Sequence, residues 1–93
     1  MNLPVNYNHL DANGRRAVRN KYIELQNGLC TECKAPLSGP AGDFVKGRRI
    51  NKNLFPENFF KYPVHLHHDH DTGWTIGAVH CECNAVLWQY YGE

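Results

Sequence analysis

Residues 64–88 read VHLHHDHDTGWTIGAVHCECNAVLW, and this stretch determines the fold that we predict. Residues 64–67 alternate apolar and polar side chains, which is typical of a half-buried β-strand. Residues 71–73 (DTG) form a turn signal. The alternation then resumes on one face of a second strand, at Trp74, Ile76 and Ala78. Together these features predict a β-hairpin.

A short helix is predicted directly after the hairpin. Apolar residues recur at helical spacing in the segment that follows Cys83, at Ala85, Leu87, Trp88 and Tyr91. The predicted order of elements in this part of the chain is therefore hairpin and then helix, with a cysteine-containing segment at the join.

Residues 11–26 predict another helix, which follows an irregular lead-in over residues 1–10. Asp11 is a suitable N-cap, and Gly28 lies where a helix-ending glycine is expected. The residues expected on the buried side of this helix are Val18, Tyr22 and Leu25. Its other faces carry Arg15, Arg16 and Arg19, which either are simply solvated or contact phosphates.

The connection over residues 36–63 is longer than most loops, so we expect it to be functional or to carry small elements of its own. Its basic residues are candidates for contact with DNA, namely Lys46, Arg48 and Arg49. Four phenylalanines are interleaved with them, Phe44, Phe55, Phe59 and Phe60. We expect these rings to complete a small core.

A chain of 93 residues allows one domain, and a core of this size needs an additional staple. The net charge of +1 conceals two different halves. Residues 1–52 carry nine Lys and Arg against four Asp and Glu (+5), and residues 53–93 carry one against five (−4). A basic half beside a His-rich half suits nucleic-acid binding next to a cation, although ordinary surface scatter explains the charges equally well.

We expect the four cysteines to bind a metal rather than to form disulfides. The sequence shows no apolar signal segment and no long apolar run, so we expect an intracellular protein with no membrane partner. Two disulfides are disfavoured in a reducing compartment. A pair at C-x-x-C spacing, Cys30 and Cys33, and a distant second pair, Cys81 and Cys83, favour a structural zinc site.

Five of the six histidines lie between His65 and His80. Imidazoles supply both metal ligands and bases that are neutral near physiological pH. His65 and His67 share one face of the predicted strand, and His68 lies where the strand gives way to the turn. One imidazole can then hold a cation while its neighbour accepts a proton. The alternative is a solvent-facing strand edge that binds metals adventitiously.

The chain resembles the HNH, or ββα-metal, nucleases, and most closely the phage recombination endonuclease VII branch. The resemblance covers about residues 28–88, nearly two-thirds of the chain. It rests on four segments in this order, Cys30-x-x-Cys33, His65-Leu66-His67-His68-Asp69-His70-Asp71-Thr72-Gly73, Trp74 to Val79, and His80-Cys81-Glu82-Cys83-Asn84-Ala85. It implies a small α+β fold in which zinc staples a ββα-metal hairpin–helix unit, preceded by the N-terminal helix.

The resemblance also implies roles for individual residues. His68 matches the family's general base, and His67 precedes it at the position of a cation ligand. Asn84 matches the second protein ligand of the catalytic cation. His70 falls where the family has a histidine close to the scissile phosphate, whereas His65 is expected to support the strand.

The sequence departs from the family pattern at the cation ligand. His67 stands where the endonuclease VII branch has an aspartate, which removes a hard oxygen ligand and a negative charge. We therefore expect one divalent cation, Mg²⁺ or Mn²⁺, with Ni²⁺, Co²⁺ or Zn²⁺ tolerated. The hairpin loop also lacks the middle asparagine of the H-N-H triplet, so the group that orients His68 is unassigned, with a backbone carbonyl as one candidate.

The second half of the zinc knuckle also departs from the family, in which both halves have C-x-x-C spacing. Counting back from Cys83 by that interval leads to His80 rather than Cys81. We therefore predict a structural zinc held by Cys30, Cys33, His80 and Cys83, with Cys81 as the alternative fourth ligand.

We expect a single HNH nuclease domain over residues 1–93. It comprises the lead-in and basic helix (1–28), the first zinc knuckle (29–35), the connection (36–63) and the catalytic ββα-metal unit (64–93). The expected function is that of a phage- or mobile-element-like DNA endonuclease, acting in the host cytoplasm if phage-encoded. It would contact mainly backbone phosphates, nick DNA with weak specificity, and need two visits or a homodimer for a double-strand break. The alternative is a non-catalytic zinc-ribbon DNA-binding module.

Overall fold

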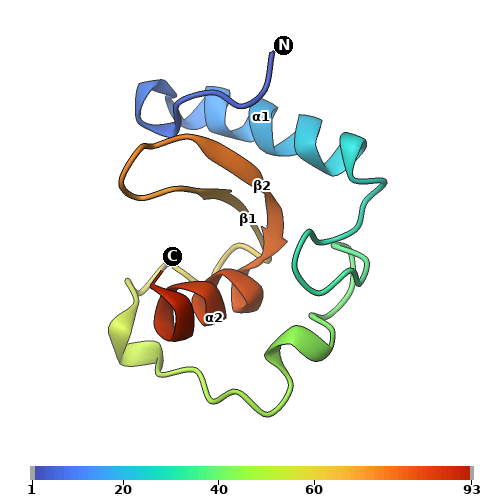
Figure 1. The fold of residues 1–93 in the computed structure, drawn as a ribbon, viewed down its shortest axis with the longest axis vertical. Coiled ribbons are helices and arrows are strands. Elements are labelled where there is room, and N and C mark those ends of the chain that lie inside the picture. The colour runs from blue at the N-terminus through green and yellow to red at the C-terminus, as the bar shows by residue number, and fades with distance from the viewer. Residues whose placement is uncertain (1, 93) are drawn as a thin grey trace.

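The computed structural model describes residues 2–92, so the ends of the expected domain, Met1 and Glu93, lie outside the described residues. Within residues 2–92 the chain forms a small α+β fold (Figure 1). Its main elements are α1 (Ala12–Leu25), β1 (Val64–His68), β2 (Thr75–His80) and α2 (Cys81–Tyr91). The predicted hairpin, the helix that follows it and the N-terminal helix are confirmed. None of the helices in residues 2–92 is both long and apolar enough to cross a membrane.

The antiparallel β1–β2 hairpin lies between the two helices, as Figure 1 shows, and both helices contact both strands. The C-terminal half of β2 is therefore covered on both faces, and Ala78 and Val79 are fully buried. They belong to a core cluster that also contains Cys30, Leu37 and Cys83. Because this cluster is small and two of its five members are cysteines, a metal ion bound by those cysteines would add stability beyond that of the apolar packing.

Helix α1 begins as predicted, because the Asp11 carboxylate accepts a hydrogen bond of 2.7 Å from the Gly14 backbone N–H. Val18 is buried, and Tyr22 packs against the core. The prediction that Leu25 is buried is wrong, since its side chain is 60% exposed. It shares a helical face with Val18, so helical phase alone does not determine whether a side chain of α1 is buried.

Gln26, which caps α1, fixes the helix to the middle of β2. Its Nε2 donates to the Ala78 carbonyl at 2.9 Å, and its Oε1 accepts from the Ala78 N–H at 2.8 Å. The side-chain amide of Gln26 thus satisfies the N–H and the carbonyl of Ala78, which in a larger sheet would bond to another strand. Together with the hydrogen bond between the Tyr22 and Thr75 hydroxyls at 2.9 Å, this pair of bonds joins α1 to β2.

A β-bulge interrupts the hairpin between two of the histidines. His67 pairs with Gly77, but His68 pairs with Thr75, so Ile76 is an extra residue in β2. The prediction that Trp74 and Ile76 share a buried face with Ala78 is therefore wrong: they are 50% and 46% exposed. The bulge shifts the alternation, so that Thr75 is buried in their place.

The segment before α1 is ordered by the outer edge of β2. Val5 exchanges hydrogen bonds with Thr75, and the Tyr7 backbone N–H donates to the Gly73 carbonyl at 2.7 Å. Gly73 has a φ of +84°, and a Cβ there would lie 2.6 Å from Asn6 Oδ1, so only glycine fits. This segment covers the β2 edge and leaves the β1 edge open.

The connection carries two 3-10 turns, Asp43–Val45 and Lys52–Leu54, as its length suggested. Phe44 packs against the core, as predicted for these phenylalanines. The other three make a separate cluster with a tryptophan of α2, comprising Phe55, Phe59, Phe60 and Trp88. This cluster holds the connection against α2.

Candidate metal centre and adjoining cavity

Four side chains from distant parts of the chain converge on a group that could hold a metal ion. The ligand atoms of Cys30, Cys33, His80 and Cys83 all lie within 4.8 Å of one another. His80 Nδ1 is 3.3 Å from Cys33 Sγ and 3.8 Å from Cys83 Sγ. The N-terminal end of α2 therefore brings His80 and Cys83 to the C-x-x-C segment, as the spacing predicted.

The second ring nitrogen of His80 determines which nitrogen faces the sulfurs. Nε2 lies 2.9 Å from the Pro36 carbonyl oxygen and 3.0 Å from that of Gly39. Carbonyl oxygens only accept, so Nε2 carries the proton and the lone pair of Nδ1 points to the thiols. Metal-binding histidines are commonly oriented by such a carbonyl contact. The donor set and its surroundings fit a structural zinc ion.

The thiols themselves are arranged as metal ligands. The pKa of Cys30 is lowered to about 4, first because Cys83 donates a hydrogen bond to it. The pKa of Cys83 is raised, first by that same hydrogen bond and then by burial. Both side chains are buried, so without a cation the cluster has to retain protons to avoid crowding negative charge. A divalent cation in the centre would balance the charge of the thiolates, so the thiols could then lose their protons.

Cys81 lies outside this group. Its Sγ donates a hydrogen bond of 2.7 Å to the Glu82 carboxylate, and its backbone N–H donates to the Pro63 carbonyl. Burial is the first cause that raises the pKa of the Cys81 thiol, to about 12. The Cys81 sulfur is not among the ligand atoms that converge within 4.8 Å of one another. Of the two alternatives for the fourth position, the arrangement favours His80.

A cavity of about 480 Å³ lies at the open edge of β1, between α1 and α2. Its polar lining combines two groups of predicted residues, Arg15, Arg16 and Arg19 from α1, and His68, His70 and Asn84 from the hairpin and α2. His65 also lines it, whereas His67 is not among its lining residues in the described part of the chain. His67 is instead only 3% exposed.

His65 links Asn84 to the connection. Its Nε2 lies 2.7 Å from the Phe59 carbonyl oxygen and therefore carries the proton. Its Nδ1 then accepts a hydrogen bond of 3.1 Å from Asn84 Nδ2, which leaves the amide oxygen of Asn84 for another partner. Burial lowers the pKa of His65 and keeps it neutral, in agreement with the supporting role predicted for it.

His68 is held in a stack of rings at the mouth of this cavity. Its imidazole lies on the Tyr7 ring with 3.7 Å between centroids and 4° between planes. The His70 ring is 5.0 Å away at 29°. Burial lowers the pKa of His68, and a backbone interaction with Leu66 opposes this in part. The imidazole is therefore neutral at physiological pH.

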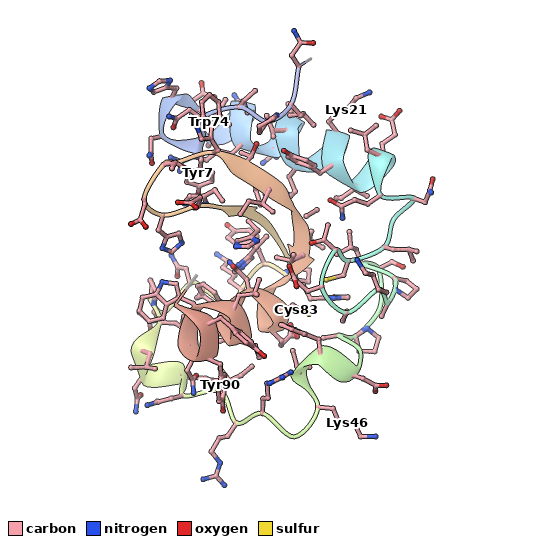
Figure 2. The ribbon with its side chains drawn as sticks, in the orientation of Figure 1. Tyr7, Lys21, Lys46, Trp74, Cys83 and Tyr90 are labelled. Carbon is pink, nitrogen blue, oxygen red and sulfur yellow. The ribbon has the colours of Figure 1, made fainter. Side chains whose placement is uncertain are left out.

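The basic residues of the connection do not line the cavity. Arg48 donates to the Phe44 carbonyl and, at 3.0 Å, to the Tyr91 hydroxyl, so it joins the connection to the end of α2. Lys46 and Arg49 are exposed in the same region. Figure 2 shows Lys46 at the end of the molecule opposite Tyr7. Among the basic residues of the described chain, the arginines of α1 are the ones that line the cavity with the histidines.

Tyr7 is the residue of this site that sequence reasoning missed. It lies in the segment predicted as an irregular lead-in, 61 positions before the histidine that it contacts. No spacing or motif connects the two residues. Only the pairing of the lead-in with the hairpin turn brings them together.

Comparisons of the chain with protein-family models, with curated proteins and with solved structures found no match.

Proposed function

We propose that this protein is a metal-dependent DNA endonuclease of the HNH type, which hydrolyses phosphodiester bonds. One observation carries the proposal: a neutral histidine, an asparagine amide and the arginines of α1 line the same cavity. Hydrolysis of a phosphodiester needs a base for the attacking water and positive charge around the phosphate. A site that only binds DNA has no need of the base.

His68 supplies the base in this proposal. Its lowered pKa keeps the imidazole unprotonated at physiological pH, so it can accept the proton of a water molecule that attacks phosphorus. His70, the neighbouring ring on its other side, is exposed and lies where the phosphate of a bound strand would pass. The two histidines would thus have different roles because His68 is half-buried against Tyr7 and His70 is exposed.

His67 and Asn84 would hold the catalytic cation. His65 and His67 lie two residues apart on one face of β1, and His65 contacts Asn84, so this face is directed to the first turn of α2. The amide oxygen of Asn84 would suit Mg²⁺ or Mn²⁺, and the imidazole nitrogen of His67 is the reason that Co²⁺, Ni²⁺ or Zn²⁺ would also be tolerated. When bound, such a cation stabilises the charge that develops on the phosphate oxygens.

The substrate of this site would be DNA, bound mainly through its phosphates. Arg16 and Arg19 lie one helical turn apart along the cavity, which suits successive contacts with one strand. One site of this kind cuts one strand. The proposal is therefore a nicking or weakly specific enzyme, for which a double-strand break requires a homodimer or a second encounter.

A plasmid assay separates this proposal from a non-catalytic zinc-ribbon DNA-binding module. With Mg²⁺ or Mn²⁺, the zinc-loaded protein is expected to convert supercoiled plasmid to the nicked circle. EDTA at a concentration that leaves the protein zinc in place should stop the reaction. DNA retardation without any nicking, under every cation tried, would instead establish the binding module.

Two basic residues of α1, Arg19 and Lys21, are predicted to affect DNA affinity differently. Arg19→Ala removes a charge from the cavity, so the slope of log affinity against log salt should fall by roughly 1. Lys21→Ala is the matched control, since Lys21 lies on the same helix, pairs with Glu24 and is not among the cavity residues. Fluorescence anisotropy with a labelled duplex at several salt concentrations measures both slopes. Equal changes in the two variants would contradict the placement of DNA along the cavity.

A further inference from the structure

The ring stack at His68 continues beyond Tyr7. The Arg15 guanidinium carbon lies 4.0 Å from the centroid of the Tyr7 ring, and His68 lies 3.7 Å from that centroid. Two groups this close to one centroid have to occupy opposite faces of the ring. The tyrosine is therefore enclosed between a cation from α1 and the imidazole from the end of β1.

The other two members of this stack, Tyr7 and Arg15, each have further contacts with the protein. The Tyr7 backbone donates to the Gly73 carbonyl at 2.7 Å, which attaches it to the hairpin turn. Asn6 and Asn8 approach Gly73 so closely that a Cβ there would lie within 2.7 Å of both side chains. The Nε atom of Arg15 is buried, so this part of the side chain packs against the protein instead of extending into solvent.

His68 is the last residue of β1 and directly follows the β-bulge. Backbone pairing continues past it, since the Asp69 N–H donates to the Trp74 carbonyl at 2.9 Å, but this pairing holds the backbone and not the side-chain torsions of the imidazole. The ring itself has a backbone interaction with Leu66 and lies parallel to the Tyr7 ring, so the stack sets its plane. A shift of about 1 Å in a catalytic group can cost about 10²-fold in rate, so a base at such a position needs an external support.

We propose that Tyr7, backed by Arg15, is the positioning residue of His68. This inference rests on the proposed function, in which His68 is the general base. It assigns Arg15 to the stack and leaves Arg16 and Arg19 for phosphate. The contact uses the face of the tyrosine ring, so it requires an aromatic side chain and not the hydroxyl group.

Two variants of Tyr7 distinguish the ring from the hydroxyl. Tyr7→Phe should keep kcat for plasmid nicking close to that of the wild type. Tyr7→Leu should lower kcat by about 10²-fold with little change in KM, because the base is displaced while the phosphate contacts remain. Tyr90→Leu is the matched control, since Tyr90 is an exposed tyrosine at the far end of the molecule (Figure 2).

Proton NMR tests the stack in the absence of both DNA and the catalytic divalent cation. In the zinc-loaded wild type, the ring protons of His68 should be shifted upfield by the Tyr7 ring current. The shift should persist in Tyr7→Phe and disappear in Tyr7→Leu, whose fold is checked by its remaining amide resonances. His68 resonances that are the same in all three proteins would overturn the inference, as would a Tyr7→Phe enzyme as slow as Tyr7→Leu. A wild type that shows the shift but never nicks DNA would refute the nuclease proposal, and with it the positioning role, while retaining the stack.

Discussion

Replacing His68 with alanine is expected to abolish nicking of supercoiled plasmid. In the proposed mechanism the neutral imidazole of His68 is the general base, and a positioned general base contributes typically about 10²–10⁴-fold to a rate. The side chain lies outside the Cys₃His group, so the zinc content of the variant should equal that of the wild type. DNA affinity should also persist, because the arginines of α1 remain.

His9→Ala provides the control for this experiment. His9 is an exposed histidine of the lead-in, and it is not among the residues that line the cavity. Nicking should therefore continue in that variant at the wild-type rate. Nicking by His68→Ala at the rate of His9→Ala would remove His68 from the role of base.

Replacing Cys83 with serine is expected to unfold most of the protein under conditions in which the wild type is stable. Structural zinc in small domains contributes an apparent free energy of about 10–16 kcal/mol near pH 7, which exceeds the stability of a typical small domain. Cys83 is both a ligand in the Cys₃His group and a member of the core cluster. The variant should contain no tightly bound zinc by elemental analysis and should lose its cooperative thermal transition by circular dichroism.

Cys81→Ser is a matched control, two positions away on the same helix. The Cys81 thiol is engaged with Glu82, and a serine hydroxyl can donate the same hydrogen bond. One zinc per chain and a cooperative transition should remain. If Cys81→Ser instead loses the metal and Cys83→Ser keeps it, the assignment of the ligands is wrong.

The local parts of the fold and site could be predicted because short spacings determine them. His80 and Cys83 are three residues apart, and the first turn of α2 directs both to the C-x-x-C segment. The hairpin followed from the alternation around residues 71–73, and α1 followed from Asp11 as its N-cap. Each of these features depends on neighbours within a few positions along the chain.

The features that were predicted wrongly or missed depend on long-range packing. Leu25 has the helical phase of Val18, yet its side chain is 60% exposed because burial depends on which elements cover that turn and not on phase alone. Ile76 faces outward because one extra residue enters β2, and alternation alone does not locate a bulge. Tyr7 reaches His68 only through the hairpin turn, and Arg48 joins the connection to α2 instead of the cavity.

The two walls of the cavity are encoded far apart, with Arg16 and Arg19 before residue 20 and Asn84 near the end of the numbered sequence. During translation the arginines of α1 therefore leave the ribosome well before Asn84 is synthesised. On the proposed function, a partly translated chain would carry the arginines that attract nucleic acid but not the complete hydrolytic centre. For an enzyme that would cut the DNA of the cell in which it is made, this order of synthesis delays activity until the last helix has folded.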